Sequence, residues 1–330
     1  MRTRITAIGA IVLATTLLAA CGGGGTAEGG EASGTSTGSG AEVTQVTVGV
    51  IPILDVAPIY LGVEQGFFKD NGLELTLETA QGGAAIVPAI LSGQYQFGFS
   101  NNTSLLLAQS KGLPLKIVAP GSSSTSQPGE DFAGVVVKAD SPIKTAADLA
   151  GKSVAINTLN NISDTVVREA VRKDGGDPTG IKFVELPFPD MPAAVAEGRV
   201  EAAFVVEPFL AISEGQGARD VASAYALATD DLSVATYFTS AQLIKSDPDL
   251  VKAFADAMVK SQKYATEHPD DVRRIITTYT KIDPALIDKL TLPAFPDALR
   301  TESIQVLADL AMKDGLLKEK ADVKALTADS

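Results

Sequence analysis

Short polar side chains gather in the loops that follow the predicted strands, and these residues are the most able to bind a ligand. Asn, Ser, Thr and Gln can hydrogen-bond a small molecule, and glycines allow the backbone to approach it closely. In open parallel sheets, ligands bind beyond the carboxyl ends of the strands. Any single Asn or Ser could instead cap a helix, but we expect part of the set to contact a ligand. The candidate binding residues are Leu54, Asp55, Tyr60, Gln81, Gly82, Gly83, Ser100, Asn101, Asn102, Thr103, Asn157, Asn160, Asn161, Ser163, Phe188 and Glu207.

The charges near these loops bear on the chemistry of the ligand. The loops contain no Lys or Arg, so an anion there would depend on helix N-termini and neutral donors. The acidic residues Asp55, Asp190 and Glu207 would suit an amine or the N–H of a heterocycle, unless they lie on a solvated rim. Aromatic side chains nearby could stack on a flat ring or pack into the core; they are Tyr60, Phe188 and Phe209. We expect a small organic solute with a polar head, which could be a sulfonate, a carboxylate or a pyrimidine-like compound.

Catalysis is not expected, because the chain is poor in nucleophiles and proton carriers. His268 is the only histidine and Cys21 the only cysteine, which argues against a Ser-His-Asp site and against metal sites built from His or Cys. Neither a phosphate-binding nor a dinucleotide-binding glycine pattern occurs, and we predict no cofactor and no metal. An enzyme that uses carboxylates alone remains an alternative.

The first residues are typical of a bacterial export signal. Arg2 and Arg4 precede an apolar run over residues 5–20, which is shorter than the roughly 20 apolar residues that span a bilayer. The run ends in Leu-Ala-Ala-Cys21, which resembles the lipobox of bacterial lipoproteins. We predict a signal peptide over 1–20, lipidation at Cys21, and a disordered Gly/Ser-rich linker over 21–41. The alternative is a plain secretory signal.

The remaining chain predicts an α/β fold of two related lobes, each a mainly parallel sheet flanked by helices. Strands expected at 46–50, 73–77 and 95–99 alternate with helices at 58–68 and 84–91, which favours a parallel sheet. The pattern recurs about a hundred residues later, and residues 93–99 match 198–204 in size and polarity. We place the first lobe at 42–130 and the second at 131–245. Helices over 246–330 are predicted to return to the first lobe.

From residue 46 to about 295 the chain resembles the solute-binding subunits of bacterial ABC importers. Its similarity is greatest to the group that handles nitrate, sulfonates, taurine and thiamine-pyrimidine precursors. The segments that carry the resemblance are 58–68, 72–75, 143–155 and the pair Glu207-Pro208. The resemblance implies a two-lobed clamshell of the type II periplasmic-binding-protein fold, with a permease and an ATPase subunit as partners. Relatives on this fold include a desulfinase and a pyrimidine synthase, so a related enzyme and a sensory binding lipoprotein stay open as alternatives.

The overall charge restricts the other partners. The formal net charge is −13 and the isoelectric point about 4.6, which argues against binding to nucleic acid. We expect a monomer outside the cytoplasm, attached to the membrane by its lipid.

Overall fold

A five-stranded sheet forms the first lobe, and its strands come from two separate parts of the chain. The computed structural model describes residues 43–328, so the predicted signal peptide, the lipidation at Cys21 and the whole of the predicted linker lie outside the described residues. The sheet has the order β2-β1-β3-β10-β4. Its strands are β1 (Thr44–Val50), β2 (Leu73–Thr79), β3 (Phe97–Asn101), β4 (Leu115–Pro120) and β10 (Ala235–Ser240).

The second lobe repeats this strand order with a different part of the chain. Its sheet has the order β7-β6-β8-β5-β9. The strands are β5 (Ala133–Val137), β6 (Ser153–Ile156), β7 (Lys182–Glu185), β8 (Ala202–Val206) and β9 (Arg219–Asp220). In each sheet three neighbouring strands run parallel and a fourth, β10 or β5, pairs antiparallel with the last of them. Two sheets of one design, as the sequence predicted, are therefore present.

The matching segments 93–99 and 198–204 occupy equivalent places in the two sheets. Each begins at a glycine with left-handed backbone, Gly93 (φ 76°) and Gly198 (φ 70°), a conformation that glycine adopts without strain. Each then leads into the central strand of its sheet, β3 or β8. The similarity in sequence thus reflects the same turn and the same buried strand.

One strand lies in a different lobe from the one that the sequence suggested. Residues 131–245 were assigned to the second lobe, but β10 pairs with β3 and β4 of the first sheet, with Tyr237 opposite Phe99. The chain therefore passes between the lobes twice, between β4 and β5 and again between β9 and β10. Along the sequence, β10 therefore follows all the strands of the second sheet.

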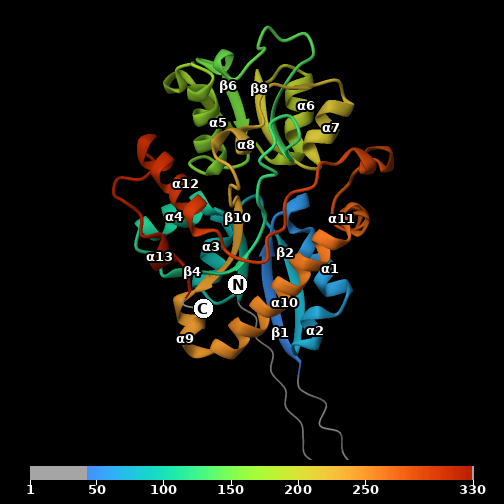
Figure 1. Cartoon of the computed structure of the whole chain (residues 1–330), viewed down its shortest axis with the longest axis vertical. Helices are drawn as coiled ribbons and strands as arrows, with labels where there is room; N and C mark the ends of the chain where they lie inside the picture. Colours follow the sequence, from blue (N-terminus) through green and yellow to red (C-terminus); the bar gives the residue numbers. More distant parts are fainter. Residues whose placement is uncertain (1–42, 329–330) are drawn as a thin grey trace, which may run out of the picture. The chain divides into compact units, whose positions relative to one another are not determined.

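Helices cover the sheets of both lobes. In the first lobe the predicted helix at 58–68 is interrupted at Gly66, which is left-handed (φ 76°). The helices of this lobe are α1 (Ala57–Glu64), α2 (Phe67–Asp70), α3 (Gly83–Leu91) and α4 (Asn102–Ser110). Those of the second are α5 (Ile162–Lys173), α6 (Met191–Ala196), α7 (Phe209–Gly215) and α8 (Ala224–Ala228). Figure 1 shows β6 and β8 between α5 on one side and α6 and α7 on the other.

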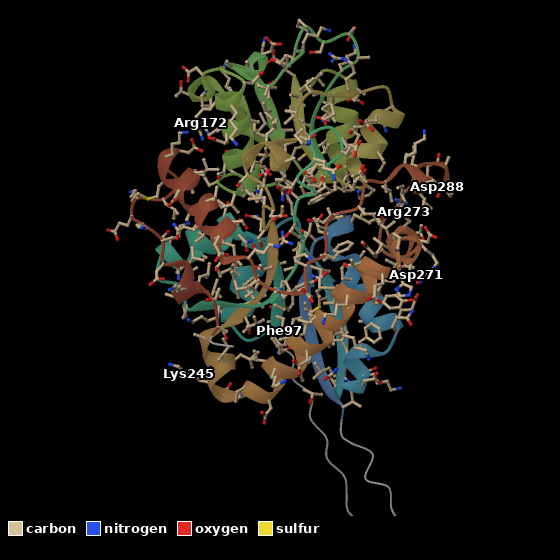
Figure 2. The ribbon with its side chains drawn as sticks, viewed as in Figure 1. Phe97, Arg172, Lys245, Asp271, Arg273 and Asp288 are labelled. Carbon is tan, nitrogen blue, oxygen red and sulfur yellow. The ribbon has the colours of Figure 1, made fainter. Side chains whose placement is uncertain are left out.

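The C-terminal region is helical and packs mainly on the first lobe. It comprises α9 (Ala241–Ser246), α10 (Pro248–Glu267), α11 (Pro269–Ile275), α12 (Thr301–Lys313) and α13 (Val323–Leu326). Phe254 of α10 stacks on Phe97 of β3, which is labelled in Figure 2, at 3.8 Å between ring centroids inside the core. Helix α12 contacts α4 of the first lobe and α5 of the second, and Arg172 of α5 pairs with Asp314 at 2.6 Å. Within residues 43–328, no helix is long and apolar enough to cross a membrane.

Candidate functional site

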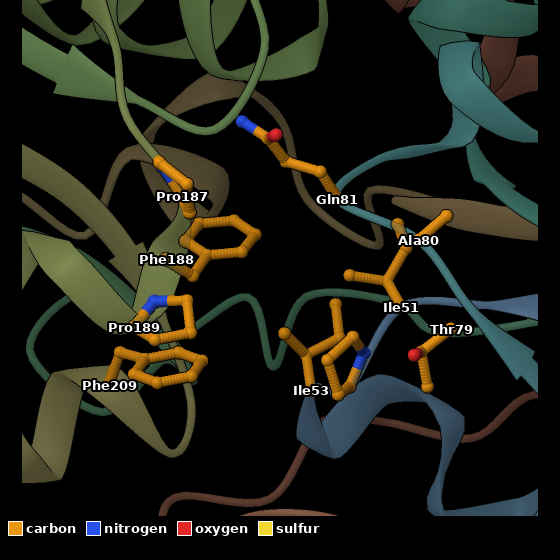
Figure 3. A pocket seen from close by; sticks show the side chains of 10 residues that line it. Ile51, Ile53, Thr79, Ala80, Gln81, Pro187, Phe188, Pro189 and Phe209 are labelled. Carbon is orange, nitrogen blue, oxygen red and sulfur yellow. The ribbon is translucent and has the colours of Figure 1, made fainter.

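A cavity of about 290 Å³ lies between the strand-end loops of the two lobes. The first lobe supplies residues that follow β1 and β2, and the second supplies residues that follow β7 and β8. In Figure 3 the aromatic and proline side chains of the second lobe form one wall, and the isoleucines and Gln81 lie opposite. The lining residues are Ile51, Pro52, Ile53, Thr79, Ala80, Gln81, Pro187, Phe188, Pro189 and Phe209. Most of the residues in this lining are apolar.

Two phenylalanines give the second-lobe wall a flat surface. Phe188 and Phe209 lie with their rings nearly parallel, at 9° and 6.0 Å between centroids. Phe188 follows Pro187 and begins a short 3₁₀ turn, whereas Phe209 begins α7 directly after Pro208. Because proline fixes φ near −65° and a proline precedes each of the two phenylalanines, the backbone that presents them is restrained.

A smaller space of about 30 Å³ adjoins the first cavity, and five of the thirteen residues that line it are polar, so we call it the small polar space. It shares Ile51, Ile53 and Phe188 with the larger cavity. Its remaining walls combine apolar residues with five polar ones. The polar residues are Asp55, Asn101, Asn157, Ser163 and Tyr225. A ligand in the two spaces together would therefore meet a flat apolar surface at one end and hydrogen-bonding groups at the other.

Asp55 is the acidic residue of this lining, and it is only 2% exposed. The Ser122 hydroxyl donates to its Oδ1 at 2.6 Å, and Oδ2 has no hydrogen-bond partner among the described residues. Burial raises the pKa of Asp55 to about 7, with a smaller contribution from nearby Asp131, while the bond from Ser122 acts in the opposite direction. Burial also raises the pKa of Tyr225, which lines the same space, well above its ordinary value.

The amide side chains of the site connect the two lobes. Gln81 donates through Nε2 to the carbonyl of Asn157 at 2.9 Å, and Asn157 donates through Nδ2 to the carbonyl of Gln81 at 3.3 Å. Asn161 donates to Oδ1 of Asn157 at 2.8 Å. Asn101 accepts a bond from the backbone N–H of Ser104 and so caps α4. These contacts hold polar groups from both lobes beside the cavity.

Two other predicted residues pack away from the two cavities, Leu54 fully buried and Tyr60 partly buried. Leu54 is fully buried in a cluster with Leu61, and Tyr60 stacks on Tyr279 at 3.9 Å. Burial raises the pKa of Tyr60 to about 12. Neither Leu54 nor Tyr60 is among the residues that line the two cavities.

The residues after β3 mainly hold the first sheet together. Asn102 donates to the carbonyl of Ser233 and accepts from the Thr236 hydroxyl, each at 2.8 Å. It thereby fixes the returning strand β10 to the start of α4. Thr103 is fully buried beside it, and its hydroxyl has no partner among the described residues.

Two predicted residues, Gly82 and Gly83, instead allow close packing. Gly83 lies against Ser100, where a Cβ atom would overlap the Ser100 side chain. A Cβ atom at Gly82 would come within 2.9 Å of the Thr158 side chain, which belongs to the other lobe. The glycine pair therefore permits the approach of chain segments, which is one of the roles expected of glycine.

In the loop before α5, some residues cap the helix and another lines a separate cavity. Asn161 and Asp164 form a reciprocal capping box at the start of α5, and Ser163 reaches the small polar space. Asn160 has left-handed backbone (φ 56°). It lines a different cavity, of about 410 Å³, with residues of α3 and α4.

Glu207 lies near the site but outside both linings. Its side chain is 1% exposed and accepts backbone N–H bonds from Ala211 at 3.0 Å and Thr291 at 3.1 Å. Burial raises its pKa to about 7, against the effect of these two bonds. The peptide bond from Glu207 to Pro208 is cis.

The residues predicted from the sequence come mainly from loops that border the two cavities, but most of the apolar residues in those loops were not among them. Ile51, Ile53 and Pro187 lie in those loops, and a count of apolar residues at the strand ends would have found them. Phe209 was named as a possible stacking residue but was not among the candidates. Tyr225 lies in α8, away from the strand ends, and no local pattern indicated it.

These features define a two-lobed α/β protein with its candidate ligand site between the lobes. The chain belongs to the family described as NMT1/THI5 like, which matches residues 54–272. The taurine-binding periplasmic protein of Escherichia coli (strain K12) is 26% identical over 204 residues, which cover 62% of this chain and 61% of that protein. The putative aliphatic sulfonates-binding protein of Bacillus subtilis (strain 168) is 22% identical over 320 residues, which cover 93% of this chain and 90% of that protein.

A solved structure shares the fold over nearly the whole described chain. The alkanesulfonate-binding protein SsuA from Xanthomonas axonopodis pv. citri, bound to MOPS, matches with a TM-score of 0.74 at 19% identity. The match covers 88% of this chain and 100% of that one. The expected periplasmic-binding-protein-like fold is therefore confirmed.

Proposed function

We propose that this protein is the solute-binding subunit of an ABC importer. The observation that carries the proposal is the cavity of about 290 Å³ to which the strand ends of both lobes contribute. A ligand there touches both halves of the molecule, so its binding energy can hold the lobes together. The relatives named above are binding proteins, which supports the same function.

The proposal also covers the location of the protein and its partner proteins. Lipidation of Cys21 would hold it at the outer face of the membrane, where a permease and its ATPase would receive the solute. The cavity is at the small end of the range for ligand sites. The solute is therefore a small molecule, and the Phe188–Phe209 wall suits a flat or apolar part of it.

A reaction that depends on histidine is not supported by the position of the one histidine. His268 is exposed at the start of α11, with its ring stacked on Tyr264 at 3.9 Å. Its Nδ1 lies 2.8 Å from the carbonyl of Tyr264. It is not among the residues that line the two cavities.

The test is a thermal-shift screen of the full chain against sulfonates, aromatic acids, pyrimidines and amines, followed by calorimetry of any hit. A ligand at 100 times its Kd adds about 2.7 kcal/mol to the free energy of unfolding. Phe188→Ala should weaken binding of the hit at least about tenfold, since the ring forms part of the wall. Val184→Ala, at an exposed position of β7, is the matched control and should bind normally. Turnover of the hit by the purified protein, or the absence of any hit, would reject the proposal, whereas equal binding by both variants would show that the hit does not depend on Phe188.

A further inference from the structure

The Asp55 carboxylate is a buried acceptor that points to the chemistry of the solute. It lines the small polar space, and its Oδ1 is already engaged by Ser122 at 2.6 Å. Its Oδ2 is buried and has no partner among the described residues. A buried carboxylate oxygen without a donor loses the hydrogen bonds that water would supply, so such an atom is normally satisfied by a ligand or a neighbour.

The surroundings supply no positive charge to this acceptor. The residues that line the two cavities include no Lys, Arg or His. Within residues 43–328, Asp55 takes part in no ion pair. The titratable groups that act on it or respond to its charge are one acid and three tyrosines. They are Asp131, Tyr225, Tyr237 and Tyr279.

This arrangement disfavours an anionic head group at the polar end. A sulfonate or carboxylate beside Asp55 would meet like charge with no cation to offset it. An N–H donor, by contrast, would satisfy Oδ2 directly, and a charged N–H would form the stronger bond. The flat wall formed by Phe188 and Phe209 favours a ring as the body of the same ligand.

Resting on the proposed function, we propose that the solute is a small flat ring compound with an N–H donor, and that Asp55 determines this specificity. The N–H group donates to Oδ2 of Asp55, and the ring lies against Phe188. Burial raises the pKa of Asp55 to about 7 in the free protein, and a bound cation would lower it, because a cation favours the ionised carboxylate that burial disfavours.

Three aromatic probes of similar size separate the possibilities. Benzamidine is a cation with N–H donors, benzamide is a neutral N–H donor, and benzenesulfonate is an anion without one. Calorimetry on the full chain should give the order benzamidine, then benzamide, then benzenesulfonate, with about tenfold or more between the first and the last. This comparison uses the natural protein, so it does not depend on the folding of a variant.

The variant Asp55→Asn tests the residue itself. It keeps the shape of the side chain and an oxygen acceptor for Ser122. It should weaken benzamidine binding about ten- to hundredfold and reduce the difference in affinity between benzamidine and benzenesulfonate. Asp220→Asn is the matched control, because Asp220 also has a pKa raised by burial, to about 6, and lines neither cavity. It should bind benzamidine as the natural protein does.

The outcomes distinguish this inference from the proposed function. Benzenesulfonate binding as tightly as benzamidine, or unchanged benzamidine affinity in Asp55→Asn, would overturn the inference and leave a solute-binding protein in place. A failure of all three probes would also overturn it if the wider screen yields a sulfonate. If the wider screen yields no ligand either, the proposed function fails with it.

Discussion

Glu207 shows how one side chain can support a binding site without lining it. Its carboxylate holds the N–H groups of Ala211 in α7 and of Thr291 in the C-terminal region. Its backbone carbonyl accepts from Leu54 of the first lobe at 2.9 Å. Three segments that are distant in sequence thus meet at this residue, and Phe209 of the cavity wall lies two positions further along the chain.

Replacing Glu207 by alanine should mainly reduce stability. Two buried N–H groups would lose their acceptors, so we expect the free energy of unfolding to fall by about 1–3 kcal/mol in urea titrations. Glu214→Ala, at an exposed position of α7, should change the free energy of unfolding by less than about 0.5 kcal/mol. Unchanged stability combined with lost ligand binding would instead make Glu207 a ligand contact, as its sequence position first suggested.

At the scale of elements, α1 and α10 pack closely because a glycine faces the contact. Gly62 of α1 lies against Ser261 of α10 and Phe68 of α2. A Cβ atom there would overlap the Ser261 hydroxyl and come within 2.7 Å of the Phe68 ring. Ser261 is itself fixed, since it is fully buried and donates to the carbonyl of Ala257 at 2.7 Å.

Gly62→Ala should therefore destabilise the protein even though alanine is the better helix former. Overpacking of a filled contact costs about 1–3 kcal/mol, which exceeds the gain in helix propensity of about 1 kcal/mol. Val63→Ala on the exposed side of α1 (42% exposed) provides the control and should cost about 0.5 kcal/mol or less. A melting temperature of Gly62→Ala equal to or above that of the natural protein would show that the helices separate freely.

At the scale of the whole molecule, acidic side chains are buried in the interior, and acidic residues also dominate the net charge. Burial raises the pKa of Asp55 and Glu207 to about 7 and that of Asp164 and Asp220 to about 6. The formal net charge is −13. For both reasons, negative charge costs more free energy in the folded state than in the unfolded chain.

Stability should consequently fall as the pH rises from about 5 to about 8. Between the ordinary pKa near 4 and the raised values, the folded state binds protons that the unfolded state has lost, so the free energy of unfolding decreases with pH. Exposed acids with lowered pKa, such as Asp174 and Asp177, act in the opposite sense only below about pH 4. Calorimetric melting at fixed ionic strength would measure this. Asp55→Asn should flatten the decline, and a melting temperature that rises with pH would contradict the assignment.

Much of the architecture could be predicted because it depends on local patterns. Apolar β-rich runs such as 46–50, and helices that end at Gly93 and Gly198, indicated alternating strands and helices. The repeat of one turn and one strand at 93–99 and 198–204 indicated two related sheets. These signals are local, since they follow from backbone preference and from which side of an element is buried.

The sequence by itself therefore determined the α/β class, the duplication and the loops that hold the site. Only the tertiary structure decided that β10 joins the first sheet, because strand pairing is made by backbone groups that every residue carries. It also decided which loop residues face the cavity, placing Ile53 and Phe209 there and Asn102 in the core. A polar side chain binds whichever partner the fold brings near it, and that partner can lie more than a hundred residues away, as Ser233 does from Asn102.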